Sequence, residues 1–384
     1  MSIARWSKNP YWENKLNVEP IYHLETDGVL EFHQKIEGYQ ASSLVELPSL
    51  AAELGVGKLW VKDESTRFNL NAFKALGASY AAHKWMEQNQ QSQNPEGMTF
   101  CTATDGNHGR AVAWSAKKLG VKAVIYVPQN TVSARIDSIK SEGAEVVVVP
   151  SHYDDTVLQA ASDASKNGWQ VISDTAYEGY MEIPKYIMSG YSTIFRELES
   201  TMGTDSDPGV DYVFLQAGVG GLAAAASWYY GVKYQEKRPR LICVEPTDAD
   251  CLLVSIENEG GEMKSSNGAQ DSIMAGLNCG TPSMIAWPVI KQMMYGFMSI
   301  SDDDAKDAMK VLGRPVGNDQ KIISGESGAA GMGGLLALMR DPKFEKTKQE
   351  LGIGVDSKIL IISTEGDTDP GNYQRILNEV ENDK

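Results

Sequence analysis

The sequence is poor in cysteine, histidine and basic residues, and these shortages exclude several classes of protein. Its 384 residues contain four cysteines and five histidines, with no Cys-x-x-Cys pair and no cluster of histidines. A disulfide scaffold or a structural zinc site is therefore not expected. Only 35 Lys and Arg residues oppose 51 Asp and Glu residues, which gives a net charge of −16. This balance argues against binding to nucleic acids or to anionic membranes.

Long apolar runs are also missing. No segment approaches the roughly 18 consecutive apolar residues that a membrane-spanning helix needs. The segment Met1–Lys8 lacks the apolar core of a secretory signal. We therefore expect a soluble, cytoplasmic protein that holds any anionic ligand by local devices such as helix N-termini.

What the sequence does contain is an alternation of short β-branched runs with longer amphipathic runs, which predicts an α/β protein with mostly parallel sheets. Some runs, such as Val146–Val149, are apolar on both faces, as in a parallel sheet covered by helices. The expected strands are 59–62, 98–103, 123–127, 144–149, 170–173, 212–216, 241–244 and 358–362. The expected helices are 25–38, 72–87, 108–119, 134–142, 154–166, 183–199, 222–234 and 302–312.

A lysine near the start of one expected helix is the first candidate for chemistry. The helix is predicted to begin near Asn71, a residue type that caps helices well, which places Lys74 in the first turn. An amine between Phe73 and Ala75, close to a helix N-terminus, loses some of its proton affinity. That environment suits a lysine that forms a Schiff base. The alternative is a surface lysine whose stem covers Phe73.

Two further loops follow expected strands and carry polar residues. Thr104-Asp105-Gly106-Asn107-His108 leads from a strand into a helix, so its backbone amides can grip a carboxylate. Asp105 can also be a simple cap in an Asp-Gly turn, and His108 can pack or cap. Asp174 comes just after another strand, where an ordinary loop aspartate is the alternative.

A glycine-rich turn, Gly218-Val219-Gly220-Gly221-Leu222, joins an expected strand to an expected helix, a geometry that binds phosphate. It also reads as GxGxxA, and Glu245 ends the next strand, as in a dinucleotide site with the carboxylate on a ribose. The turn alone leaves a dinucleotide and a phosphate monoester as rival ligands. The last expected strand ends in Ser363 and Thr364, at the edge where open α/β sheets bind ligands. The small residues of 324–331 allow either close approach to a ligand or tight helix packing.

In this order, the blocks resemble the fold-type II family of pyridoxal-phosphate (PLP) enzymes, which includes serine racemase, threonine deaminase and the tryptophan synthase β chain. Within it they are most similar to the diaminopropionate ammonia-lyases. The resemblance runs from about Glu46 to Tyr373, and its most specific segments are 67–74, 103–110, 174–180, 273–277 and 364–369.

The resemblance implies a role for each matched residue. Lys74 matches the lysine that binds the cofactor aldehyde, and Asn107 matches the residue beside the ring hydroxyl. Thr364, with Ser363 as the less favoured candidate, matches the hydroxyl that faces the pyridine nitrogen. A neutral hydroxyl there favours elimination over transamination. The loop that matches the phosphate-binding turn consists of Gly218, Val219, Gly220, Gly221 and Leu222.

The implied activity is α,β-elimination on 2,3-diaminopropionate, in its D form, its L form or both, to give pyruvate and ammonia. Many relatives carry a serine where this sequence has Asp105, and the resemblance implies that Asp105 takes the α-proton of the D-isomer. Asp174 is implied to lie near the distal amine of the substrate and to assist with the L-isomer. The residues implied to bind the substrate are Thr104, Asp105, Asn107, His108 and Asp174.

The family also implies a homodimer of two-domain subunits. On that basis the large, PLP-binding domain comprises 1–94 and 186–384, and the small domain comprises 95–185. Cys251 and Cys279 match positions at which similar enzymes carry cysteines, and in a reducing cytosol we expect two free thiols.

Three alternative functions stay open at this point. The same cofactor can support elimination from serine, threonine or 3-hydroxyaspartate. An NAD-dependent oxidoreductase would use the glycine turn and Glu245, but would leave Lys74 and Asn107 unexplained. The third alternative is a protein that binds the cofactor without catalysis, and the joint presence of Lys74, Asp105 and Asp174 argues against it.

Overall fold

The computed structural model describes residues 4–13, 24, 27–89, 97–104, 106–151 and 153–379. The chain folds as two compact units. The first combines residues 1–21, 41–66 and 194–384, and the second combines 22–40 and 67–193. The small domain predicted over 95–185 lies within the second unit, which also includes 67–94 and 186–193.

The first unit is built on a seven-stranded sheet with the strand order β1-β10-β9-β8-β11-β3-β2. The inner strands are parallel, and only the edge strands β1 and β2 pair antiparallel with their neighbours. The strands are β1 (Arg5–Lys8), β2 (Ser43–Glu46), β3 (Lys58–Asp63), β8 (Tyr212–Gln216), β9 (Arg240–Pro246), β10 (Gly296–Ile300) and β11 (Lys358–Ser363).

The sequence predicted β3, β8, β9 and β11 but missed β1, β2 and β10. The first two are four-residue edge strands, too short for a clear pattern. β10 opens with Gly296, a residue that disfavours strands. Packing requires this glycine, because an added Cβ would lie 2.0 Å from the ring of Trp6 on β1.

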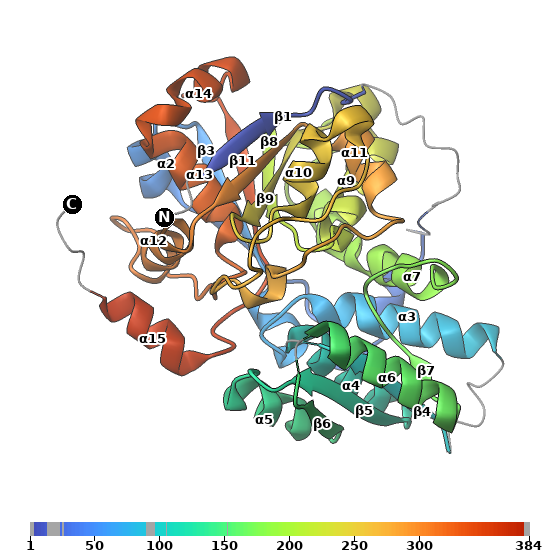
Figure 1. Cartoon of the computed structure of the whole chain (residues 1–384). Helices are drawn as coiled ribbons and strands as arrows, with labels where there is room; N and C mark the ends of the chain where they lie inside the picture. Colours follow the sequence, from blue (N-terminus) through green and yellow to red (C-terminus); the bar gives the residue numbers. More distant parts are fainter. Residues whose placement is uncertain are drawn as a thin grey trace. The chain divides into compact units, whose positions relative to one another are not determined.

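Helices cover this sheet, and α13 packs against β8, β9, β10 and β11 (Figure 1). Its close approach depends on Gly334, where a Cβ would lie 2.7 Å from Val244 Cγ2 on β9. The helices of this unit are α2 (Pro48–Leu54), α9 (Gly221–Tyr234), α10 (Cys251–Glu257), α11 (Trp287–Met293), α12 (Asp302–Gly313), α13 (Ala330–Arg340), α14 (Glu345–Leu351) and α15 (Pro370–Asn378). Shorter 3-10 turns are η3 (Glu197–Ser200), η4 (Gln235–Lys237), η5 (Glu259–Gly261), η6 (Ala275–Leu277) and η7 (Pro342–Phe344).

The second unit contains a four-stranded parallel sheet in the order β6-β5-β4-β7. Its strands are β4 (Thr99–Ala103), β5 (Lys122–Pro128), β6 (Glu145–Val149) and β7 (Gln170–Val171), all of which the sequence predicted. The expectation that β6 is covered on both faces is wrong. β6 is an edge strand, and Val148 remains 49% exposed although its neighbours are apolar.

The helices of the second unit include a closely packed pair, α3 and α7. A Cβ on Gly77 of α3 would lie 2.5 Å from Tyr191, and one on Gly190 of α7 would lie 2.4 Å from the Leu76 carbonyl oxygen. The helices are α1 (Val29–Gln34), α3 (Lys74–Gln88), α4 (Asn107–Leu119), α5 (Ser133–Ser141), α6 (Tyr153–Asn167) and α7 (Glu182–Tyr191).

The single helix predicted over 183–199 is wrong, because α7 ends at Tyr191. A short helix α8 (Thr193–Arg196) and the turn η3 follow it. The division between the two units falls at 193/194, inside this broken segment. The turn η2 (Glu64–Asn69) spans the division at 66/67 in the same way.

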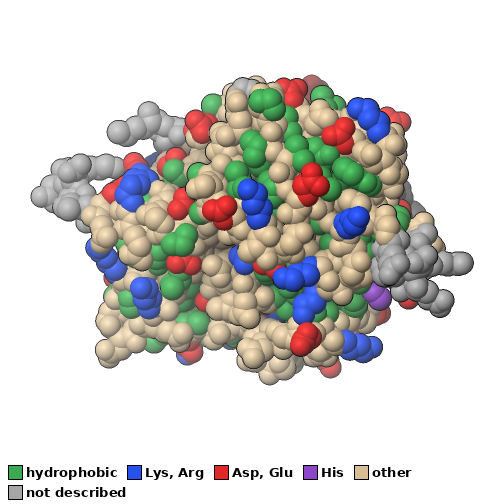
Figure 2. All heavy atoms as spheres, turned by 90° about the horizontal axis from the view of Figure 1, so that it is seen from below, with side chains coloured by type: hydrophobic (Ala, Val, Ile, Leu, Met, Phe, Trp, Pro, Cys, Tyr) green, Lys and Arg blue, Asp and Glu red, His purple; other side chains and the backbone are tan. Residues whose placement is uncertain are grey.

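The surface carries both signs of charge despite the net negative balance. On the face that Figure 2 draws, basic and acidic side chains are interspersed among apolar and neutral ones. Within the described ranges, no helix is both long and apolar enough to cross a membrane.

Candidate active site

Lys74 is the first residue of α3, and an irregular turn leads into it. Phe68, Asn69 and Asn71 all have positive φ angles, at 49°, 59° and 57°. The prediction that Asn71 caps the helix is therefore wrong, since its backbone is left-handed and Phe73 occupies the N-cap position. The turn and the Gly77 packing together fix where the lysine side chain begins.

The Lys74 amine contacts the carboxylate of Asp174. Its Nζ donates to Asp174 Oδ2 at 2.6 Å, and the two side chains are 21% and 18% exposed. The Phe73 and Tyr191 rings flank the amine, with centroids 5.4 and 5.9 Å away. Burial alone would raise the pKa of Asp174, but the charge of Lys74 and its hydrogen bond hold it well below its usual range. This carboxylate therefore stays ionised and suits a cationic partner.

His108 lies beside the same carboxylate. Its Nε2 is 2.8 Å from the Ile172 carbonyl oxygen, which can only accept, so the hydrogen resides on Nε2. Its Nδ1 is 3.8 Å from Asp174 Oδ2, and the side chain is 6% exposed. Burial lowers the pKa of His108, with Asp174 acting in the opposite direction, so the ring is neutral near pH 7.

Thr104 shapes the loop that leads into α4. Its Oγ1 accepts hydrogen bonds from the backbone N–H groups of Gly106, at 2.9 Å, and Gly109, at 3.0 Å. Asn107 is the first residue of α4. Asp105, the predicted base, lies outside the described residues. The second unit therefore brings together Lys74, His108 and Asp174, all of which the sequence predicted.

The glycine turn of the first unit connects β8 to the N-terminus of the 14-residue helix α9. Gly220 has φ 100°, and a Cβ there would lie 2.6 Å from Ile290 Cδ1. A Cβ on Gly218 would lie 2.8 Å from Cys279 Sγ. The first amides of a helix have no partner within it, so this turn has the form of an anion site.

The hydroxyl groups of Ser363 and Thr364 have different partners. Ser363 Oγ is fully buried and lies 2.8 Å from Ser324 Oγ. Thr364 Oγ1 accepts a hydrogen bond from Gln216 Nε2 at 2.5 Å. This bond leaves the Thr364 proton available to a lone pair such as that of an unprotonated pyridine nitrogen. Sequence reasoning did not assign Gln216 a role, although a polar residue that ends the buried strand β8 was a usable signal.

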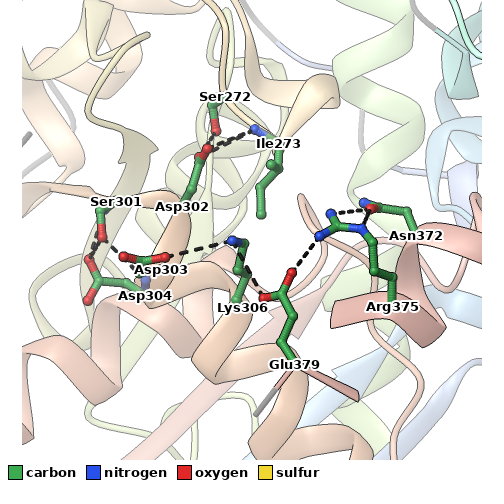
Figure 3. Close-up of polar contacts among 10 residues, drawn as sticks. All are labelled: Ser272, Ile273, Ser301, Asp302, Asp303, Asp304, Lys306, Asn372, Arg375 and Glu379. Atoms are coloured by element: carbon green, nitrogen blue, oxygen red, sulfur yellow. Dashed lines mark hydrogen bonds and ion pairs between the residues drawn. The ribbon is translucent and has the colours of Figure 1, made fainter. Parts of the chain in front are cut away.

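The loop behind Gly218 is held by the start of α12. Asp302 Oδ1 accepts from Ser272 Oγ at 2.6 Å and from the Ile273 amide at 3.3 Å (Figure 3). This contact anchors the segment 272–279, whose Cys279 packs against Gly218. The neighbouring acids act elsewhere, since Asp303 pairs with Lys306 and Asp304 forms a capping box with Ser301 (Figure 3).

Glu245 does not fit the dinucleotide interpretation. Its side chain is fully buried, and its two carboxylate oxygens accept from the backbone amides of Leu252 and Leu253, each at 2.8 Å. Burial raises the pKa of Glu245 well above its usual range, although the two amides oppose this. Both oxygens are thus committed to the start of α10, and neither is available to a ribose.

The small-residue segment 324–331 is explained by packing. A Cβ on Gly325 would lie 2.2 Å from the Gly366 carbonyl oxygen, and one on Gly328 would lie 2.4 Å from that of Glu365. Cys251 and Cys279 are not joined in a disulfide. Among the residues with a described placement, no group of three or more His, Cys, Asp and Glu side chains could hold a metal ion.

Comparison with known proteins shows the family of this chain. The profile of the family described as "Pyridoxal-phosphate dependent enzyme" matches residues 36–353, and the chain belongs to this family. Diaminopropionate ammonia-lyase of Escherichia coli (strain K12) is 43% identical over 366 residues, which span 90% of this chain and 89% of that protein. The Salmonella typhimurium protein of the same name is 40% identical, spanning 91% of each chain.

A solved structure shares the fold. The crystal structure of the E. coli diaminopropionate ammonia-lyase in complex with D-serine has a TM-score of 0.88 and 39% sequence identity, and the match covers 98% of this chain and 97% of that one. The predicted fold class, fold-type II with mostly parallel sheets, is confirmed.

Proposed function

We propose that this protein is a PLP-dependent carbon–nitrogen lyase that performs α,β-elimination on 2,3-diaminopropionate and yields pyruvate and ammonia. The observation that carries the proposal is the 2.6 Å contact between Lys74 Nζ and Asp174 Oδ2. It places a carboxylate with a strongly lowered pKa beside the expected cofactor lysine. The two relatives at 40% and 43% identity carry the corresponding name.

The residues present fit the cofactor. Lys74 would bind its aldehyde, and Asn107 would lie beside its ring hydroxyl. The turn of Gly218, Val219, Gly220, Gly221 and Leu222 would hold its phosphate through the backbone amides at the N-terminus of α9. Packing against Cys279 and Ile290 keeps Gly218 and Gly220 free of side chains. Thr364 is the better partner for the pyridine nitrogen, since Ser363 is buried against Ser324. When bound, the cofactor supplies the electron sink for loss of the α-proton.

The chain's own residues would bind the substrate and move its protons. Asp105 would take the α-proton of the D-isomer, and Lys74 or Asp174 would serve the L-isomer. Asp174 would also hold the substrate's β-ammonium group, because a desolvated cation needs an opposite charge. Thr104, Asn107 and His108 complete the proposed substrate contacts, with Thr104 also fixing the loop through Gly106 and Gly109.

Elimination from serine, threonine or 3-hydroxyaspartate is less well supported. A β-hydroxyl group carries no charge to match the ionised Asp174. The oxidoreductase alternative is not proposed, because Glu245 is committed to α10.

The compartment, the oligomeric state and the domain boundaries are also part of the proposal. We propose a cytoplasmic homodimer whose small domain comprises 95–185. The four cysteines form no disulfide, which fits a reducing compartment, and the dimer and the domain boundaries rest on the family resemblance.

The test uses the purified protein with PLP and a panel of D- and L-amino acids, with pyruvate and ammonia measured separately. We expect 2,3-diaminopropionate to give two ammonia molecules per pyruvate, at a higher kcat/KM than serine or threonine. Pyruvate from serine at an equal or higher kcat/KM would refute the proposed substrate.

A further inference from the structure

A buried hydrogen-bond acceptor without a partner lies next to the proposed catalytic pair. The Nε2–H of His108 is used by the Ile172 carbonyl oxygen, so Nδ1 carries only a lone pair. Nδ1 has no hydrogen-bond partner in the described part of the chain, and the side chain is 6% exposed. Buried polar atoms are nearly always satisfied, so a donor placed beside this one gains a hydrogen bond.

The group that faces Nδ1 is a second acceptor. Asp174 Oδ2 lies 3.8 Å from Nδ1, which is too far for a direct hydrogen bond. In the neutral ring Nδ1 also carries no proton that it could donate to this oxygen. Two acceptors at this separation can both be reached by one donor atom placed about 2.8 Å from each. Lys74 Nζ already shows that Asp174 Oδ2 accepts an N–H donor, at 2.6 Å.

The number of protons on the donor then decides which ligand fits. A hydroxyl has one proton and can satisfy only one of the two acceptors, whereas an ammonium has three. An ammonium also brings the positive charge that an ionised Asp174 requires.

Resting on the function proposed above, we propose that His108 Nδ1 and Asp174 Oδ2 together form the subsite for the substrate's β-ammonium, with His108 determining the preference for an amine over a hydroxyl or halide at Cβ. His108 is thus a substrate-binding residue through its side chain. Its Nε2 keeps the ring oriented by donating a hydrogen bond to the Ile172 carbonyl oxygen.

Two substitutions separate the two nitrogens of the ring. In His108→Gln, the side-chain amide reaches the place of Nε2 and can still donate to Ile172, but nothing replaces the Nδ1 acceptor. In His108→Asn, the amide oxygen lies near the place of Nδ1, while the bond to Ile172 is lost. The experiment compares kcat/KM of the holoenzymes for 2,3-diaminopropionate and for β-chloroalanine, which has an uncharged leaving group.

For His108→Gln we expect kcat/KM for diaminopropionate to fall about 10- to 100-fold, the usual cost of losing a hydrogen bond to a charged group. Turnover of β-chloroalanine should change by less than about 3-fold. His108→Asn should lower kcat/KM for both substrates by a similar, smaller factor. The preference for diaminopropionate over β-chloroalanine is then retained. In a Lys74→Ala background, where turnover is blocked, adding His108→Gln should weaken calorimetric binding of diaminopropionate by a similar factor. Cofactor affinity should not change.

Equal losses for the two substrates in His108→Gln would overturn the proposal and leave His108 a purely structural role. A preference lost in His108→Asn but kept in His108→Gln would also overturn it. If the unaltered enzyme does not prefer diaminopropionate at all, the proposed function fails first, and the subsite fails with it. Circular dichroism of each variant identifies a folding defect, and the calorimetric comparison then uses whichever variant is folded.

Discussion

The two units use the same architectural element, a turn from a parallel strand into a helix, in different ways. In the first unit, the turn before α9 relies on glycines and backbone amides, and its shape is set by neighbours such as Ile290. In the second unit, the proposed function depends on the ionisable side chains of Lys74, His108 and Asp174, which lie close together. A backbone site is sensitive to the size of a side chain, whereas a side-chain site is sensitive to charge and protons. Each prediction below tests one side of this contrast.

Lys74→Ala should have the largest effect. Without the amine no covalent link to the cofactor can form, and we expect activity to fall by at least about 10³-fold. The glycine turn is untouched, so the protein should still bind the cofactor reversibly, without the visible band of the covalent link. Spectra before and after gel filtration measure this. Lys84→Ala, on the same helix, is the control. A surviving band in Lys74→Ala would rule out this lysine.

Asp174→Asn should have the second largest effect on activity. It keeps the size of the side chain but removes the charge beside Lys74, and we expect kcat/KM for diaminopropionate to fall about 10²-fold or more. Cofactor affinity should hardly change, because the phosphate turn contains no part of this residue. Steady-state kinetics and a cofactor titration separate the two quantities. A parallel loss of cofactor affinity would show that Asp174 has a mainly structural role.

Gly220→Ala tests the glycine turn of the first unit, whose backbone amides would bind the cofactor phosphate. A side chain at φ 100° is strained, and its Cβ would lie 2.6 Å from Ile290 Cδ1. Strain of about 1–3 kcal/mol should weaken cofactor binding about 10- to 100-fold, with little change in kcat at saturation. Gly354→Ala is the matched control, since an added Cβ there meets nothing within 4 Å. Unchanged cofactor affinity in Gly220→Ala would contradict the assignment of the turn.

The sequence predicted more of the second unit than of the first. Three of the four strands of the smaller sheet, β4, β5 and β6, have β-branched or apolar runs of five to seven residues, and the two-residue β7 lies within the apolar segment predicted as a strand. Of its site residues, His108 and Asp174 follow β4 and β7 closely, whereas Lys74 begins the helix α3. In the first unit, β1 and β2 were missed because each has only four residues, and β10 was missed because it opens with Gly296, which is needed only for packing against Trp6 of the distant β1. The same limit applies to the sites. The family resemblance favoured Thr364 over Ser363, and this stays a prediction. The different hydrogen-bond partners of the two hydroxyl groups, Gln216 and Ser324, could not be predicted, because only the fold brings them near.

The free energy of unfolding at mildly acidic pH should depend on His108 in the second unit. The folded pKa of His108 lies below its ordinary value of 6.5, so below pH 6.5 the unfolded chain binds a proton that the native state does not. The contribution of His108 to the free energy of unfolding is therefore lost as pH falls below 6.5 and is constant above it. The Asp174 contribution is retained until much lower pH, because its folded pKa is depressed. Between pH 7.5 and 5.5, His108 should account for at most about 1.4 kcal/mol. Urea unfolding of His108→Gln should show a smaller pH dependence than the unaltered chain, and an equal dependence would contradict this.

The smallest effect is expected from the start of α12, where three adjacent acids differ in what they hold. Asp302→Ala removes the acceptor for Ser272 and Ile273, and the segment behind Gly218 loses its anchor. We expect cofactor affinity to fall about 3-fold and stability by about 1 kcal/mol. Asp303→Ala is the matched control, because it removes the same charge from the same helix end but only a 3.8 Å surface pair with Lys306. If both variants weaken cofactor binding equally, the charge at the N-terminus of α12 is responsible and the anchoring of segment 272–279 is not. If only Asp302→Ala does so, and Asp302→Asn restores most of the loss, the backbone turn depends on a hydrogen bond from a neighbouring loop and the contrast between the two units holds.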